Sequence, residues 1–201
     1  MSTVVMLSPR DHGRPLTVEE FENARWQEGY KYELIAGRLY VSPLPDLPHD
    51  QIVRWLNRLV DDYARVRPEV INYVTPQARV FVPGGTPATR PEPDLAAFAD
   101  FPLDLPIGAV QWEDVSPILV GEVLSEDDPD KDLVRNVELY EQVPSIREYW
   151  IIDPRADANR PDLRVYRRRG RRWQKPIDVP AGGTYTTRLL PGFTLVIDPR
   201  R

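Results

Sequence analysis

The stretch that decides the fold is Pro117-Ile118-Leu119-Val120-Gly121-Glu122-Val123-Leu124-Ser125, an apolar run that a single carboxylate interrupts. Such a run predicts a central β-strand that is buried on both faces. A helix expected over 131–142 separates it from a second apolar, β-favouring run at 148–152, which together predict a strand–helix–strand crossover. Glu122 needs a partner, because an ionisable side chain in an apolar strand is costly unless it is paired or bound to a metal.

The other segments predict an α/β domain with a mixed central sheet flanked by helices. A capping box at Thr17 and Glu20 predicts a short helix over 18–26, and helical apolar spacing predicts a longer amphipathic helix over 49–65. Extra N-terminal strands are expected within 32–41, turning at Ala36-Gly37, and a hairpin is expected around Gly170. Further strands are expected over 70–74, 78–82, 93–98 and, as a C-terminal β-hairpin, within 184–198, with turns at 83–87 and at Pro191-Gly192. Residues 1–15 are expected to be loosely ordered and 16–201 to form a single domain.

Composition restricts the kind of partner and the compartment. The 201 residues contain no cysteine and carry a net charge of −5, so any metal must be held by oxygen or histidine ligands. No apolar run reaches the roughly 20 residues that cross a bilayer, and the start lacks a signal peptide, so we expect no membrane contact and a cytoplasmic location. Five arginines between 167 and 172 indicate either a solvated hairpin tip or a loop that contacts phosphate.

Asp94 is the second carboxylate of interest, because it follows Pro93 at the start of its own predicted strand. Two carboxylates on neighbouring strands can point to one face and share a hard cation such as Mg²⁺ or Mn²⁺. The alternative is that Asp94 and Glu122 are each satisfied by a nearby arginine or a backbone N–H.

Several segments in this order resemble the Uma-two type of restriction endonuclease, within the PD-(D/E)XK nuclease superfamily. They are Tyr32–Gly37, Pro93–Ala96, Glu122–Ser125, Leu139-Tyr140, Arg147–Pro154 and Leu190–Phe193. The resemblance spans about Leu16 to Ile197 and implies a restriction-endonuclease-like fold that hydrolyses DNA phosphodiester bonds with a divalent cation. It implies that Asp94 and Glu122 are the metal ligands, that Glu33 is an outer carboxylate, and that the protein is a homodimer. The alternative for Glu33 is a surface pair with Lys31 or Arg38.

The sequence departs from that family where a lysine is expected. Leu124 stands two residues after Glu122, and Asn136 stands at the helical position to which the lysine moves in the Uma-two type. Lys131 and Arg135 are the nearby cations, although on an α-helix Lys131 faces differently from Asn136 and Arg135 lies about 100° round the helix. The departure leaves a second interpretation open: a weakly active or inactive relative that acts as a binding or interaction module.

The remaining candidates have weaker support. His49 is either a helix cap or surface residue, or a residue near the metal or substrate; Ser125 and Tyr140 lie in the matching segments and are candidates for substrate contact. Tyr149 and Trp150 are expected in the core, and Ser125 lacks the G-x-S-x-G setting of a serine nucleophile. A carboxylate-pair glycosidase is a third hypothesis, for which only the carboxylates themselves speak.

Overall fold

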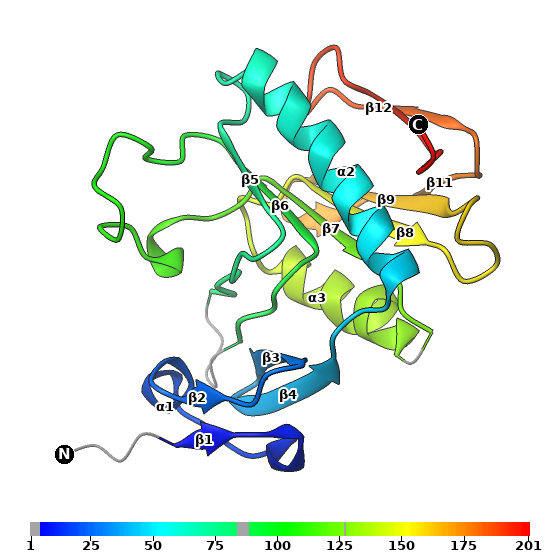
Figure 1. Cartoon of the computed structure of the whole chain (residues 1–201). Helices are drawn as coiled ribbons and strands as arrows, with labels where there is room; N and C mark the ends of the chain where they lie inside the picture. The colour runs from blue at the N-terminus through cyan, green and yellow to red at the C-terminus, as the bar shows by residue number, and fades with distance from the viewer. Residues whose placement is uncertain (1–4, 84–88, 127) are drawn as a thin grey trace.

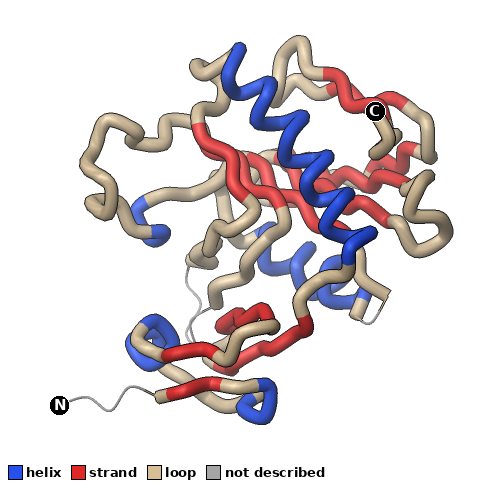
Figure 2. Tube along the Cα trace, viewed as in Figure 1, coloured by secondary structure: helices blue, strands red, loops and turns tan. Residues whose placement is uncertain are grey.

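The computed structural model describes residues 5–83, 89–126 and 128–201. Its main body is a seven-stranded sheet in the order β10-β9-β8-β7-β6-β5, with β11 also paired to β9 (Figures 1 and 2). The strands are β5 (Tyr73–Thr75), β6 (Leu95–Phe98), β7 (Leu119–Val123), β8 (Glu148–Asp153), β9 (Asp162–Arg169), β10 (Arg172–Trp173) and β11 (Ile177–Val179). Only β7 and β8 are parallel, so the sheet is mixed, as the sequence predicts.

β7 occupies the centre of this sheet, and all five of its residues are buried. It pairs with antiparallel β6 on one side and with parallel β8 on the other, where Glu122 lies opposite Ile151. The predicted strand–helix–strand crossover is confirmed. Its helix, however, begins with a π-helical turn, Lys131–Arg135, before the α-helix α3, Asn136–Glu141.

The two faces of the sheet are covered by different helices. α2 (Leu47–Val66), which Asp46 caps, lies across one face and packs Ile52, Leu56 and Val60 into the largest core cluster (Figure 1). The C-terminal hairpin of β12 (Thr184–Thr186) and β13 (Thr194–Val196) closes this cluster, as predicted. α3 covers the other face with a second cluster that includes Leu124 and Tyr140.

Residues 5–43 form an N-terminal unit with a small apolar cluster of its own. It contains β1 (Met6–Leu7), a 3-10 turn (Pro9–Asp11), α1 (Val18–Glu22), β2 (Arg25–Trp26), β3 (Tyr30–Ile35) and β4 (Arg38–Pro43). The hairpin β3–β4 turns at Ala36 and Gly37, both at positive φ, as predicted. Within the expected loose segment, β1 pairs with β2 and Leu7 is fully buried. The helix expected over 18–26 stops at Glu22, because residues 25 and 26 pair with β1 instead.

Two strand predictions in the middle of the chain were wrong in detail. Residues 78–82 form no strand, because only Val80 and Val82 donate backbone hydrogen bonds to the facing segment, to Pro91 and Thr89. Proline lacks an N–H, so Pro91 cannot return a bond and a ladder does not develop. The strand expected over 70–74 is β5, shifted by about three residues, and β6 begins one residue after Asp94. Of the turn expected at 83–87, residues 84–87 lie outside the described residues. A short 3-10 turn, Trp112–Asp114, lies in the loop before β7.

Candidate active site

Asp94 and Glu122 lie against each other where β6 begins and the neighbouring antiparallel strand β7 ends. The Asp94 N–H donates to Glu122 Oε2 at 3.3 Å, and the Val123 N–H donates to Asp94 Oδ2 at 3.0 Å. The Asp94 side chain is 15% exposed and Glu122 is 1% exposed. The structure therefore brings the two predicted carboxylates together, and backbone N–H groups satisfy one oxygen of each.

Glu122 is fixed by the crossover helix on its other oxygen. Glu122 Oε1 accepts hydrogen bonds from the Tyr140 hydroxyl at 2.7 Å and from Asn136 Nδ2 at 3.0 Å. Burial, followed by the charges of Asp132 and Asp94, raises the pKa of Glu122 well above its usual range. A nearby positive charge would stabilise the ionised form of such a buried carboxylate.

Asp132 is a third carboxylate in this cluster, and the sequence reasoning missed it. It is 3% exposed, and its Oδ1 accepts a hydrogen bond at 2.8 Å from the same Asn136 Nδ2 that donates to Glu122. Burial raises the pKa of Asp132 to about 7, with a further contribution from the charge of Asp94. The available signal was the spacing, because Asp132 lies four residues before Asn136 and so shares its face of a helix.

Glu33 lies in β3 and reaches the site from the N-terminal unit. It is 1% exposed; Lys131 Nζ lies 3.3 Å and Arg135 Nη2 3.5 Å from its Oε2, and the Glu92 N–H donates to its Oε1 at 2.9 Å. Burial opposes its ionisation, but the charges of Lys131, Lys31 and Arg135 outweigh it and lower the pKa of Glu33 to about 2. The surface-pair alternative for Glu33 was wrong.

The expected lysine positions hold no cation, but two lysines from elsewhere enter the cluster. Leu124 packs in the second core cluster and Asn136 bridges two carboxylates. Lys131 was expected to face differently from Asn136, but its side chain is only 13% exposed and pairs with Glu33, so both residues contact carboxylates of the cluster. A π-helical turn accounts for this, because its i to i+5 hydrogen bond brings Lys131 closer to the face of Asn136.

Lys31 is the second lysine, and sequence reasoning had considered it only as a surface partner of Glu33. Its Nζ lies 3.4 Å from Asp94 Oδ1, and its side chain is 20% exposed. Burial opposes its charge, but the charge of Asp94 raises the pKa of Lys31. Side chains two apart on a strand share a face, so a buried Glu33 implied that Lys31 would point the same way.

Helix α2 also contacts Asp94 and the end of β7. Asn57 Nδ2 donates to the Asp94 carbonyl at 2.8 Å. His49 Nε2 donates to the Val123 carbonyl at 2.8 Å and lies 3.5 Å from Asp94 Oδ2, so His49 belongs to the site and not to the surface. Burial opposes the ionisation of Asp94, but mainly Lys31, and then His49, lower its pKa.

The donor set fits a cation held by two carboxylates. Among the described residues, no three His, Asp or Glu side chains form a group that would hold a metal ion, and Glu33 is engaged by Lys131 and Arg135. Asp94 and Glu122, by contrast, are hard oxygen donors crowded together with Asp132, and their mutual repulsion contributes to the raised pKa of Glu122. A divalent cation would relieve this repulsion, and Mg²⁺ commonly uses one or two carboxylates with water in the other positions.

Other predicted candidates lie away from this cluster or serve the fold. Arg168 donates to the carbonyls of Tyr140, Glu141 and Val143 at 2.8–3.0 Å, which satisfies the end of α3. Arg169 and Arg171 are exposed near the hairpin tip, in agreement with the solvated-tip interpretation. Ser125 is exposed beyond the end of β7. Tyr149 and Trp150 are fully buried, as expected of core residues.

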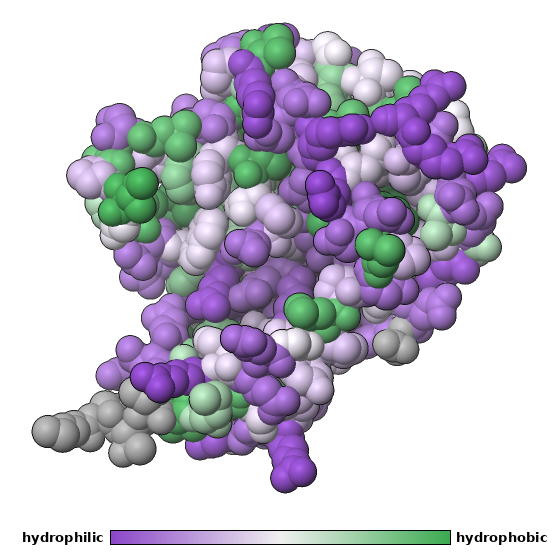
Figure 3. Space-filling model, viewed as in Figure 1, coloured by the Kyte–Doolittle hydropathy of each residue, from purple (hydrophilic) through white to green (hydrophobic). Residues whose placement is uncertain are grey.

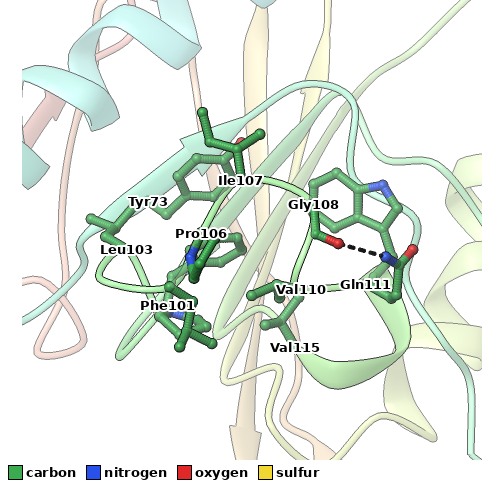
Figure 4. Close-up of a pocket in the computed structure, with 12 residues that line it drawn as sticks. Tyr73, Phe101, Leu103, Pro106, Ile107, Gly108, Val110, Gln111 and Val115 are labelled. Carbon is green, nitrogen blue, oxygen red and sulfur yellow. Dashed lines mark hydrogen bonds between the residues drawn. The ribbon is translucent and has the colours of Figure 1, made fainter.

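The surface adds two features. A hydrophilic hollow lies where the N-terminal unit meets the main body (Figure 3). A separate apolar pocket lies in the loop between β6 and β7, lined by residues such as Tyr73, Phe101, Val110 and Val115 (Figure 4). None of the predicted site residues lines this pocket. Within the described ranges, no helix is long and apolar enough to cross a membrane.

Comparison with known proteins identifies a family and a shared fold. Residues 18–198 match the Uma2 family, whose description is "Putative restriction endonuclease". A solved structure, described as a putative nuclease belonging to DUF820 from Anabaena variabilis, superposes with a TM-score of 0.68 at 18% identity. The match covers 91% of this chain and 96% of that one, so the two share a fold. No curated protein matches the sequence.

Proposed function

Because the chain belongs to the Uma2 family of restriction endonucleases, we propose that it is a nuclease that hydrolyses phosphodiester bonds of DNA with a divalent cation, Mg²⁺ or Mn²⁺. The observation that carries the proposal is the Asp94–Glu122 pair, one half-buried and one buried carboxylate joined by a backbone hydrogen bond at 3.3 Å. Such a pair offers hard oxygen ligands where β6 begins and β7 ends.

Asp94 and Glu122 would hold the cation, which when bound polarises a phosphoryl oxygen and lowers the pKa of a water molecule. Tyr140 and Asn136 orient Glu122 through its Oε1. Its Oε2 accepts only the longer hydrogen bond from the Asp94 N–H among the described contacts, and it is the oxygen that would ligate the cation. Asn57 holds the Asp94 backbone. These contacts fix both carboxylates before a ligand arrives, which limits the reorganisation that binding requires.

Lys131, Arg135 and Glu33 form the outer part of the proposed site. Glu33 holds both cations within 3.5 Å of one carboxylate oxygen. A lysine or arginine placed in this way can stabilise charge that develops on a phosphoryl group. His49 and Ser125 stay candidates for substrate contact, whereas the fully buried Tyr140 would act on the substrate only through Glu122. A homodimer would place two such sites on the two DNA strands.

Plasmid cleavage tests the proposal. The purified protein should nick or linearise supercoiled DNA in Mg²⁺ or Mn²⁺ but not in EDTA, and Asp94→Asn and Glu122→Gln should each reduce the rate by at least about a hundredfold. Glu141→Gln is the matched control, because Glu141 lies at the end of α3 and pairs with Arg172. Cleavage that persists in Asp94→Asn would refute the assignment. Light scattering of the same sample tests the homodimer.

A binding module without turnover is the second candidate function. Leu124 is a core residue, and Asp94 already carries an ion pair with Lys31. This alternative is supported if the protein binds Mn²⁺ in calorimetry and retards DNA in gels, yet cleaves no plasmid, single-stranded or supercoiled substrate.

A further inference from the structure

We propose that Lys31 is the resident counter-ion of Asp94, that a divalent cation displaces it, and that the released ammonium then contacts a phosphate oxygen of the substrate. This inference rests on the proposed function and goes beyond it, because it assigns a role to a residue of the N-terminal unit. The ligand it addresses is a divalent cation together with a phosphodiester.

The geometry places Lys31 on the oxygen that a cation needs. Asp94 Oδ2 already accepts the Val123 N–H and lies near His49, whereas Asp94 Oδ1 faces Lys31 Nζ at 3.4 Å. A metal ion ligated by a carboxylate lies within about 2.0–2.6 Å of its oxygen. The ammonium group therefore occupies the approach to Asp94 Oδ1.

Lys31 differs in this from the other cations of the cluster. Lys131 and Arg135 both pair with Glu33 and not with Asp94. Among the lysine and arginine side chains in the described part of the site, Lys31 is thus the one that forms an ion pair with a proposed ligand carboxylate. A divalent charge and an ammonium group this close repel each other strongly in a partly buried site, so Asp94 can hold one or the other.

The displaced side chain has somewhere to go. Lys31 projects from β3 on a flexible four-carbon stem and is 20% exposed, so it is not sealed in the interior. Once the cation has taken the place of Lys31 at Asp94, a phosphate group bound at that cation offers Lys31 a new negatively charged partner. In this position Lys31 supplies the positive charge that is missing at both Leu124 and Asn136.

Calorimetric titration with MnCl₂ tests the inference on the full chain, with a readout other than cleavage. Lys31→Met removes the charge and keeps most of the stem, and Lys31→Gln is a second uncharged variant of different shape. A charge at this distance changes proton affinity by about one to three orders of magnitude, so both variants should bind Mn²⁺ at least about tenfold more tightly than the wild type. Lys31→Arg, which keeps the charge, should stay near the wild-type affinity.

Lys131→Met is the comparison variant, because it removes a second half-buried lysine of the site, one that pairs with Glu33 and does not lie against Asp94 Oδ1. Its effect on Mn²⁺ affinity should be several-fold smaller than that of Lys31→Met. In gel retardation with Ca²⁺, a cation used to limit turnover, Lys31→Met should bind DNA more weakly than the wild type. Without a divalent ion, when Lys31 stays on Asp94, the two should bind DNA equally.

The outcomes separate this inference from the proposed function. Wild type that binds Mn²⁺, with uncharged variants that bind equally or more weakly, overturns the counter-ion role alone. Binding of Mn²⁺ only by the uncharged variants supports the counter-ion role and contradicts a metal-dependent wild-type nuclease. If neither wild type nor variants bind Mn²⁺, both proposals fail. Circular dichroism melting of each variant confirms that it is folded before it is titrated.

Discussion

The backbone N–H of Asn136 donates to the carbonyl of Lys131, five residues earlier. In a regular α-helix two residues five apart differ by about 140° in direction, which would turn Lys131 away from the site. The wider π-helical turn instead lets Lys131 reach Glu33 while Asn136 reaches Glu122. One irregular turn thus allows a single short helix to supply both a cation and a carboxylate-bridging amide to the cluster.

Lys131→Met should destabilise the protein, because it leaves the buried Glu33 with Arg135 as its remaining ion-pair partner among the described residues. Breaking a buried ion pair typically costs about 3–5 kcal/mol; with Arg135 in place, we expect a loss of about 2–4 kcal/mol at neutral pH. Urea unfolding measures it. Arg65→Met, which breaks the exposed pair with Asp61, should change the unfolding free energy by less than about 1 kcal/mol. Equal losses in the two variants would contradict the structural account of Glu33.

The same pair predicts the acid limb of the stability profile. The pKa of Glu33 is about 2 in the folded protein, against an ordinary value of 4.5. Its contribution is therefore fully present above about pH 5 and disappears as the pH falls through about 2. The difference between wild type and Lys131→Met should shrink over that window. A difference that stays constant from neutral pH to pH 2 would show that Glu33 is not the group responsible.

Asp132 should act in the opposite direction. Its folded pKa is about 7, above the ordinary 3.8, so its protonated form adds stability that is complete below about pH 4 and is lost as the pH rises to about 7. Asp132→Asn keeps an oxygen that can accept from Asn136 but cannot ionise. We expect the metal-free variant to be more stable than wild type at pH 8 and equally stable at pH 4, as measured by chemical unfolding. Greater stability at pH 4 but not at pH 8 would reverse the assignment.

How much the sequence could predict depends on where the deciding interaction lies. β7 and α2 were predictable, because burial on two faces of a strand and on one face of a helix each leave a local apolar pattern. Residues 78–82 have an equally good strand pattern, but their pairing fails on a proline in the segment opposite. The pattern of residues 78–82 does not show which segment will lie opposite them, so the absence of a strand there could not be predicted from that pattern.

The candidate site shows the same division. Asp94, Glu122 and Glu33 were found because carboxylates in or beside apolar strands are unusual. Lys31 was within reach, since strand periodicity places it on the face of Glu33. Lys131 was named as a nearby cation, but its ion pair with Glu33 was not predicted, because an α-helix turns the residue away from Asn136 and a π-helical turn has no reliable signature in a single sequence.

Arg168 should matter for stability and not for DNA. Its guanidinium group donates to the carbonyls of Tyr140, Glu141 and Val143, at and just beyond the end of α3, where helical carbonyls run out of intrahelical partners. Arg168→Met should therefore lower the unfolding free energy by about 1–3 kcal/mol, whereas the exposed Arg171→Met should change it by less than about 0.5 kcal/mol. Gel retardation at two salt concentrations is the second measurement. A flatter salt dependence in Arg168→Met would return this arginine to the phosphate-contacting interpretation.

Tyr140 and Tyr149 offer a matched pair that separates support of the site from support of the core. Both rings are fully buried and pack edge-on, but the Tyr140 hydroxyl donates to Glu122 Oε1 at 2.7 Å and the Tyr149 hydroxyl to the Asp132 carbonyl at 2.9 Å. Removing either hydroxyl leaves a buried acceptor with one partner fewer, which costs about 1–3 kcal/mol. We therefore expect Tyr140→Phe and Tyr149→Phe to lose similar stability in urea unfolding. Only Tyr140→Phe should also change Mn²⁺ affinity, by several-fold, because it removes the hydrogen bond by which the Tyr140 hydroxyl orients the Glu122 carboxylate. An equal change in both variants would mean that Tyr140 acts through packing alone.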